Sequence, residues 1–137
     1  MSAFVLDASI ALAWCFDDEA SEDTDLLAER LRDHGAFVPN LWHLELSNVL
    51  LQAERRGRIT AADIAVRLRL LGQLPIETDA ETHLRATRDT LALARAERLT
   101  AYDAAYLELA MRRGLPLASR DQDLRAAAKR LGVGVLI

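Results

Sequence analysis

Residues 3–14 read AFVLDASIALAW, and they set the pattern for the rest of the chain. The run AFVL is apolar at every position and ends at Asp7, which is typical of a short strand buried on both faces. The mostly apolar residues 8–16 that follow predict a helix. A buried strand that leads directly into a helix is the repeating unit of a parallel α/β sheet.

The same alternation continues along the chain. Gly35 and Gly114 end two predicted helices, and Pro39–Asn40 begins another. Residues 17–23, DDEASED, are expected to form an acidic loop. The expected strands are 3–6, 36–38, 74–78, 115–119 and 134–137, and the expected helices are 8–16, 25–34, 40–56, 61–72, 79–98, 101–113 and 120–130.

Length and composition fit one globular α/β domain over residues 1–137. The chain is 51% hydrophobic and 28% charged, which is enough for a single core. We expect a parallel sheet of about five short strands, flanked by helices in three layers. No apolar run approaches the ~18 residues of a membrane span, and no membrane association is expected. Cys15 is the single cysteine, so no internal disulfide forms and a reducing cytoplasm is favoured.

Charge is distributed unevenly. The formal net charge is −4, but residues 1–50 carry ten acids and two bases, whereas residues 51–137 carry eleven acids and fifteen bases. Sixteen of the seventeen basic residues are Arg, which suits bidentate contact with phosphate or carboxylate. The polarity fits a nucleic acid or an acidic partner, while the acidic total argues against strong non-specific DNA binding.

Carboxylates follow the predicted strands. In open parallel sheets, ligands bind beyond the carboxyl ends of the strands. Asp7 directly follows strand 3–6, Asp121 comes shortly after strand 115–119, and Glu45 lies in the helix after strand 36–38. We therefore expect these acids to reach one rim of the sheet, where the hydroxyl of Ser9 can bond a carboxylate.

Each acid also has an ordinary structural interpretation. Asp7 would cap the next helix, and Glu45 would face solvent. Asp103 fits a capping box with Thr100, in which the two residues bond each other's backbone. Local spacing therefore does not separate capping from metal binding. The same spacing occurs at Thr60–Asp63, Thr78–Glu81 and Ser119–Gln122.

The joint placement of the acids is more informative than any one of them. Several carboxylates at one rim repel each other and raise each other's pKa unless a cation lies between them. Mg²⁺ or Mn²⁺ suits a set of oxygen ligands. The sequence has no Cys/His cluster for zinc and neither GxxxxGK[ST] nor GxGxxG for a nucleotide.

Four segments resemble, in order, the acidic motifs of PIN-domain ribonucleases, and most closely those of VapC-type toxins. They are FVLDASIALAW (4–14), LWHLELSNVL (41–50), LTAYDAAYLELA (99–110) and LASRDQDL (117–124). The resemblance matches Asp7, Glu45, Asp103 and Asp121 to the four acids of the family. It also matches Ser9 and Ser119 to positions with a hydroxyl near the site, although the family more often has Thr at the second of these.

The resemblance implies a Mg²⁺- or Mn²⁺-dependent endoribonuclease, the toxin of a type II VapBC-like toxin–antitoxin system in the cytoplasm. Asp7 and Asp103 would bind the ion directly, while Glu45 and Asp121 would complete the site through waters or a second ion. Water activated by the ion would cleave RNA to leave 5′-phosphate ends. The resemblance further implies a homodimer and a higher assembly with a VapB-like antitoxin, which inserts a segment, often with an Arg, into the site.

RNA needs cationic contacts beside so acidic a site. The candidates are Arg55, Arg56, Arg58, Arg112, Arg113 and Arg120. Each of them also fits an ordinary solvated charge at a helix end. Two other functions remain open: a PIN-type nuclease in RNA processing or decay without an antitoxin, and a non-catalytic metal-binding α/β interaction module. A receiver-like phosphoacceptor is disfavoured because no acid neighbours Asp7 and the only lysine, Lys129, lies inside a predicted helix.

Overall fold

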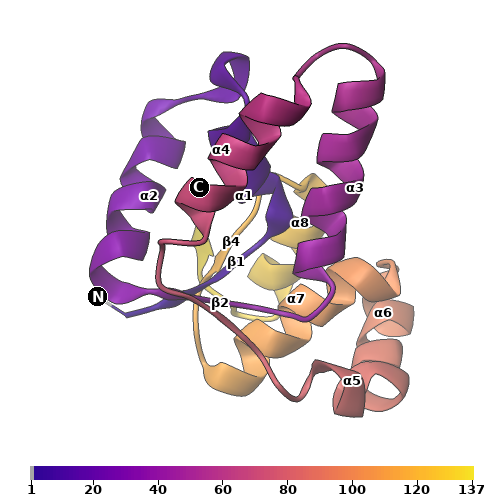
Figure 1. Cartoon of the computed structure of the whole chain (residues 1–137). Helices are drawn as coiled ribbons and strands as arrows, with labels where there is room; N and C mark the ends of the chain where they lie inside the picture. The colour runs from indigo at the N-terminus through magenta and orange to yellow at the C-terminus, as the bar shows by residue number, and fades with distance from the viewer. Residues whose placement is uncertain (1) are drawn as a thin grey trace.

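Strand β1 (Phe4–Leu6) is the centre of a five-stranded sheet, and all three of its residues are fully buried. The computed structural model describes residues 2–137. The strand order is β3-β2-β1-β4-β5, and every neighbouring pair is parallel (Figure 1). The other strands are β2 (Ala36–Val38), β3 (Ile76–Thr78), β4 (Leu117–Ala118) and β5 (Val135–Leu136).

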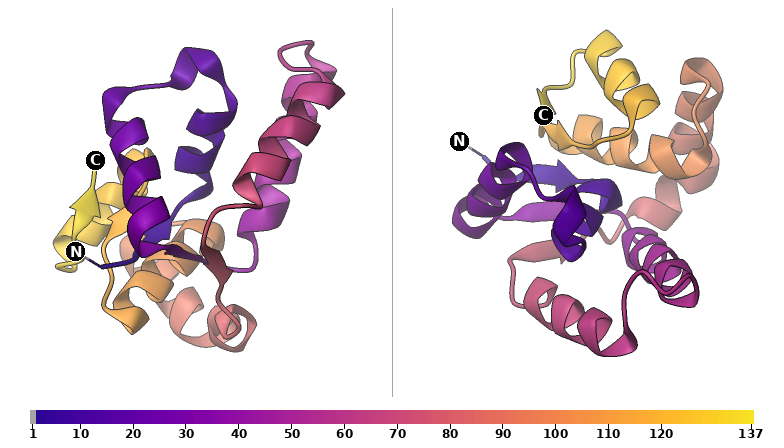
Figure 2. Two further views of the ribbon diagram at one scale, coloured as in Figure 1. Left: turned by 60° about the vertical axis from the view of Figure 1, so that its left-hand side comes forward. Right: turned by 90° about the horizontal axis from the view of Figure 1, so that it is seen from above.

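Helices cover both faces of the sheet and give the expected three layers, with α1 to α4 on one side and α5 to α8 on the other (Figure 2). Helix α7 lies against β1 and buries Tyr106, Leu107 and Leu109 completely. Among the described residues, no helix has the length and apolar character needed to span a membrane. The helices are α1 (Ala8–Cys15), α2 (Glu22–His34), α3 (Trp42–Arg55), α4 (Ala61–Leu71), α5 (Thr82–Arg85), α6 (Leu91–Glu97), α7 (Ala101–Arg113) and α8 (Gln122–Arg130).

The prediction of a loop at residues 17–23 is wrong for most of that segment. Asp17–Glu19 form a short 3-10 turn, and α2 begins at Glu22. The cause is Ser21, whose side chain accepts a hydrogen bond from the backbone of Thr24 while the Thr24 hydroxyl accepts one from the Ser21 backbone. This capping box starts the helix before the apolar periodicity does.

The single helix predicted over residues 79–98 is also wrong, because the chain forms α5, a π turn at Ala86–Thr90 and then α6. The capping box predicted at Thr78–Glu81 is absent. Thr78 belongs to β3, and Asp79 turns inward, where its side chain is fully buried and binds Arg112 and Arg113. These partners lie more than thirty residues away in sequence, so no local pattern signals them.

Candidate active site

The structure brings the four predicted acids to the carboxyl edge of the sheet. Asp7 directly follows β1, Asp121 follows β4 by three residues, and Asp103 and Glu45 lie in the first turns of α7 and α3. Their charges affect one another: Asp121 raises the pKa of both Asp7 and Asp103, and Asp7 raises those of Glu45 and Asp103. The four carboxylates therefore share one electrostatic environment.

Asp7 is held by two serines. Its Oδ2 accepts hydrogen bonds from Ser119 Oγ at 2.6 Å and from Ser9 Oγ at 2.7 Å, and the residue is only 5% exposed. Asp7 occupies the N-cap position of α1, but its side chain makes no capping hydrogen bond. Burial raises its pKa, although the two serine hydroxyls oppose this effect. The carboxylate is thus oriented by serines from two different segments of the chain.

The same serines join the loops that follow β1 and β4. Ser9 Oγ accepts a hydrogen bond from the backbone of Arg120 at 3.0 Å, and Ser119 Oγ accepts one from the backbone of Asp121 at 3.0 Å. Ser119 therefore does not cap α8, contrary to the spacing with Gln122. Asp121 caps that helix, because its Oδ1 accepts a hydrogen bond from the backbone of Leu124 at 2.9 Å.

Asp103 combines capping geometry with a strongly perturbed charge. Thr100 Oγ1 accepts a hydrogen bond from the backbone of Asp103 at 3.1 Å, so Thr100 caps α7. Burial, followed by the charges of Asp121 and Asp7, raises the pKa of the Asp103 carboxyl from 3.8 to about 6. Thr60 makes the same 3.1 Å contact with Asp63 on the solvent-exposed start of α4. Capping and an electrostatic role therefore coexist at Asp103.

Glu45 is bound by a residue that the sequence did not identify. Tyr106 is fully buried, and its hydroxyl donates a hydrogen bond to Glu45 Oε1 at 2.5 Å. Burial raises the pKa of Glu45, and Asp7 and Asp103 raise it further. Burial and the charges of Asp7 and Glu45 also move the pKa of the Tyr106 phenol far above its ordinary value, so it remains a neutral donor. The sequence feature that could have indicated Tyr106 is its position one helical turn after Asp103, on the same side of α7.

The donor chemistry of the site fits a hard divalent cation. All four ligand candidates are carboxylates, and the net negative charge at the rim calls for a counter-charge. Within residues 2–137, no three His, Cys, Asp or Glu side chains are yet grouped closely enough to hold a metal ion. Coordination by more than two of these acids therefore requires some of the side chains to rotate toward the ion.

The candidate RNA-binding arginines occupy two different environments. Arg112 and Arg113, at the end of α7, bind the buried Asp79, with Arg112 Nη2 and Asp79 Oδ2 2.7 Å apart. Arg58 and Arg120 are partly exposed and share the two oxygens of Glu19 at 2.7 and 3.0 Å. The remaining two candidates, Arg55 and Arg56, are exposed at the end of α3.

Comparisons with known proteins identify the family and the fold of the chain. The sequence profile described as PIN domain matches residues 4–130, and PIN domains are generally nucleases. The solved structure of PAE2754 from Pyrobaculum aerophilum is 25% identical, covers 98% of this chain and 91% of that chain, and has a TM-score of 0.72. FitAcB from Neisseria gonorrhoeae, at 17% identity, covers 98% and 96% with a TM-score of 0.57, which shows the shared fold. Comparison with curated proteins gives no significant match. The chain belongs to the PIN domain family.

Proposed function

We propose that this PIN domain is a divalent-metal-dependent endoribonuclease whose active site consists of Asp7, Glu45, Asp103 and Asp121. The observation that carries the proposal is the gathering of carboxylates from four separate parts of the chain, where burial and then the charges of Asp121 and Asp7 raise the pKa of Asp103 to about 6. Such crowding costs folding free energy unless a cation neutralises it, and perturbed acids of this kind cluster at functional sites.

Asp7 and Asp103 are proposed to hold Mg²⁺ or Mn²⁺ directly, with Glu45 and Asp121 completing the site. When bound, the ion would stabilise charge on the scissile phosphate and activate water for hydrolysis. Ser9 and Ser119 contribute by fixing Asp7, because two short hydrogen bonds keep its carboxylate from rotating away from the rim.

Arg120 and Arg58 are the best-placed candidates to contact the RNA backbone. The backbone of Arg120 donates to Ser9 Oγ, which in turn donates to Asp7, so Arg120 adjoins the site. Its guanidinium and that of Arg58 are held by Glu19 in exposed ion pairs. Exposed pairs contribute little free energy, so RNA phosphates can replace Glu19 at low cost. Arg112 and Arg113 are instead assigned a structural role at Asp79.

We further propose that the protein is the toxin of a VapBC-like pair, acting in the cytoplasm as a homodimer that a VapB-like antitoxin inhibits. Support comes from the order of the four acidic motifs and from the acidic site itself, which suits an arginine supplied by a partner. The second candidate is the same nuclease in RNA processing or decay without an antitoxin. A small neighbouring reading frame whose product copurifies with the protein and inhibits cleavage would favour the toxin over this second candidate.

Cleavage of structured RNA by the purified protein tests the nuclease proposal. We expect cleavage with Mg²⁺ or Mn²⁺, none with EDTA, and at least a hundredfold loss in Asp7→Asn and Asp103→Asn. Asp63→Asn is the matched control, because Asp63 has the same capping geometry away from the site, and it should cleave normally. Undiminished cleavage by Asp7→Asn would overturn the assignment. Mn²⁺ binding without any cleavage would favour the non-catalytic interaction module.

A further inference from the structure

We infer that Tyr106 is a positioning residue, which holds Glu45 in the orientation that binds the cation. The inference rests on the proposed metal-dependent function and adds a residue to it. Its basis is the hydrogen bond from the Tyr106 hydroxyl to Glu45 Oε1, which joins α7 to α3.

Tyr106 is anchored far more firmly than the residue it contacts. Its side chain is fully buried, and so are its neighbours in α7, Ala105 and Leu107. Glu45 is only partly buried and has a longer, more flexible side chain than the three aspartates of the site. The rigid partner therefore determines the orientation of the flexible one.

Every other carboxylate of the site is restrained by a hydrogen-bond donor or by a helix cap. Asp7 has two serine hydroxyls, Asp121 bonds the backbone of its own helix, and Asp103 is placed by the capped start of α7. Among the hydrogen bonds of residues 2–137, Tyr106 supplies the one donor to the Glu45 carboxylate. Because only Oε1 is used, Oε2 remains available to a cation.

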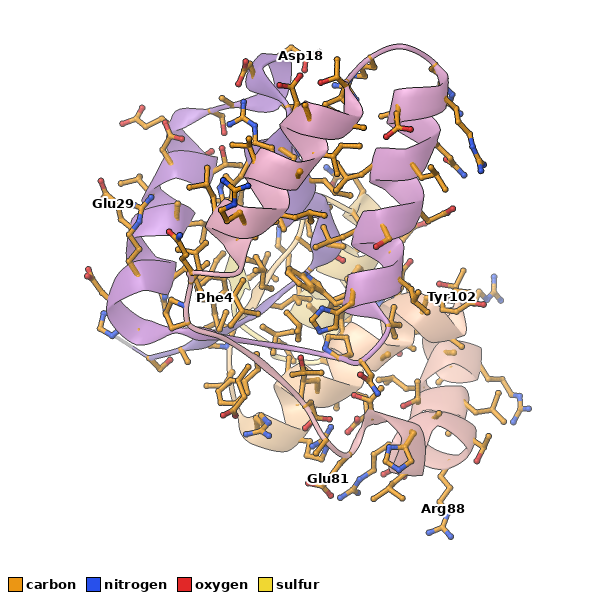
Figure 3. The ribbon with its side chains drawn as sticks, viewed as in Figure 1. Phe4, Asp18, Glu29, Glu81, Arg88 and Tyr102 are labelled. Atoms are coloured by element: carbon orange, nitrogen blue, oxygen red, sulfur yellow. The ribbon has the colours of Figure 1, made fainter. Side chains whose placement is uncertain are left out.

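The competing interpretation is that Tyr106 only fills the core, in which case Phe would serve equally well. Tyr102 offers a matched control, because it lies one turn earlier on the same helix and is 66% exposed at the surface (Figure 3). Tyr102→Phe removes a hydroxyl from α7 without touching Glu45. A general effect of losing a tyrosine hydroxyl would appear in both variants.

The test is Mn²⁺ binding measured by calorimetry in wild type, Tyr106→Phe and Tyr102→Phe. Loss of an outer partner of a metal ligand typically weakens affinity by about tenfold or more, and we expect that for Tyr106→Phe and no change for Tyr102→Phe. In cleavage assays at fixed Mn²⁺, we expect kcat to fall while KM for RNA stays constant. Urea unfolding in EDTA checks that the variant is folded.

A double-mutant cycle with Glu45→Ala shows whether Tyr106 acts through Glu45. In the Glu45→Ala background, Tyr106→Phe should weaken Mn²⁺ binding no further, because the group that it positions is gone. Wild-type affinity in Tyr106→Phe, or an equal additional loss in the Glu45→Ala background, would overturn the inference while leaving the nuclease proposal intact. If Asp7→Asn binds Mn²⁺ as well as wild type does, the proposed site fails and the inference fails with it.

Discussion

Replacing Asp103 with Asn should stabilise the metal-free protein while removing its activity. The carboxyl has a pKa of about 6 in the folded protein against 3.8 for an ordinary aspartate. At about 1.4 kcal/mol per pKa unit, the ionised side chain costs the folded state at most about 3 kcal/mol at neutral pH. Solvent reaches part of the side chain and reduces this cost. The substitution also removes a negative charge that stabilises the helix start by about 0.5 kcal/mol, so we expect Asp103→Asn to raise the unfolding free energy by about 1 kcal/mol in total.

The sign of the pH dependence follows from the raised pKa. Below about pH 4 the carboxyl is protonated in the folded state and largely so in the unfolded state, so it costs nothing. As the pH rises from about 4 to about 6, the unfolded state gains from ionisation while the folded carboxyl stays largely protonated, and above that range both states are ionised and the cost to the folded state stays constant. The advantage of Asp103→Asn should therefore be present at pH 7.5 and nearly absent at pH 4, in urea unfolding followed by circular dichroism with EDTA.

Adding Mn²⁺ should reverse the order of stability. A ligand at about a hundred times its Kd stabilises the folded state by about 2.7 kcal/mol, so wild type gains that amount and Asp103→Asn gains much less. Asp63→Asn, with the same capping contact to Thr60, should stay within about 0.5 kcal/mol of wild type throughout. If Asp103→Asn is less stable than wild type at pH 7.5 in EDTA, or keeps its full advantage at pH 4, the electrostatic reasoning is refuted.

Three further substitutions test other parts of the structure. Asp79→Asn removes the buried carboxylate that Arg112 and Arg113 share, although Arg112 keeps its ion pair with Glu108, and urea unfolding should show a loss of about 2 kcal/mol at pH 7. Burial alone would raise the pKa of Asp79, but hydrogen bonds from those arginines hold it well below its ordinary value. The ionised Asp79 therefore stabilises the folded protein above about pH 4, and the stability difference between wild type and Asp79→Asn should shrink as the pH falls below that. Ser119→Ala removes the 2.6 Å bond to Asp7, and calorimetry should show Mn²⁺ affinity about tenfold weaker. Gly35→Ala should lower the unfolding free energy by about 1–2 kcal/mol, which is more than Gly57→Ala should cost. Both glycines have positive φ, but only at Gly35 would a new Cβ lie 3.2 Å from a backbone oxygen.

Local sequence patterns were enough to predict the sheet, and they also identified most of the acids that we propose for the site. All five strands were predicted, four of them because they are short continuous apolar runs that need no partner to be recognised; β3, with the exposed Glu77 and Thr78, is not such a run. Asp7 and Asp121 were identified by the same logic, since each follows a strand. Asp103 was identified less directly, because its local spacing is that of an ordinary capped helix. Only the other acids expected at the same rim favoured metal binding over simple capping.

The parts that were missed depend on contacts between distant residues. Tyr106 bonds Glu45 across 61 residues of sequence, and its position in an apolar helix predicts only burial. The late start of the helix after β3 accompanies the buried pair of Asp79 and Arg112, which are 33 residues apart. Local periodicity does not indicate which distant side chain a carboxylate will bind, so such pairs can be identified only from the three-dimensional structure.

The hydrogen bond between Ser119 and Asp7 has a consequence for biosynthesis, because it joins residues 112 positions apart. The central strand leaves the ribosome early, but its neighbour β4 and the serine that restrains Asp7 arrive only after most of the chain has been made. Pairing over so long a separation is slow and comes late in folding. A nascent chain therefore lacks part of the proposed nuclease site until synthesis has passed residue 121.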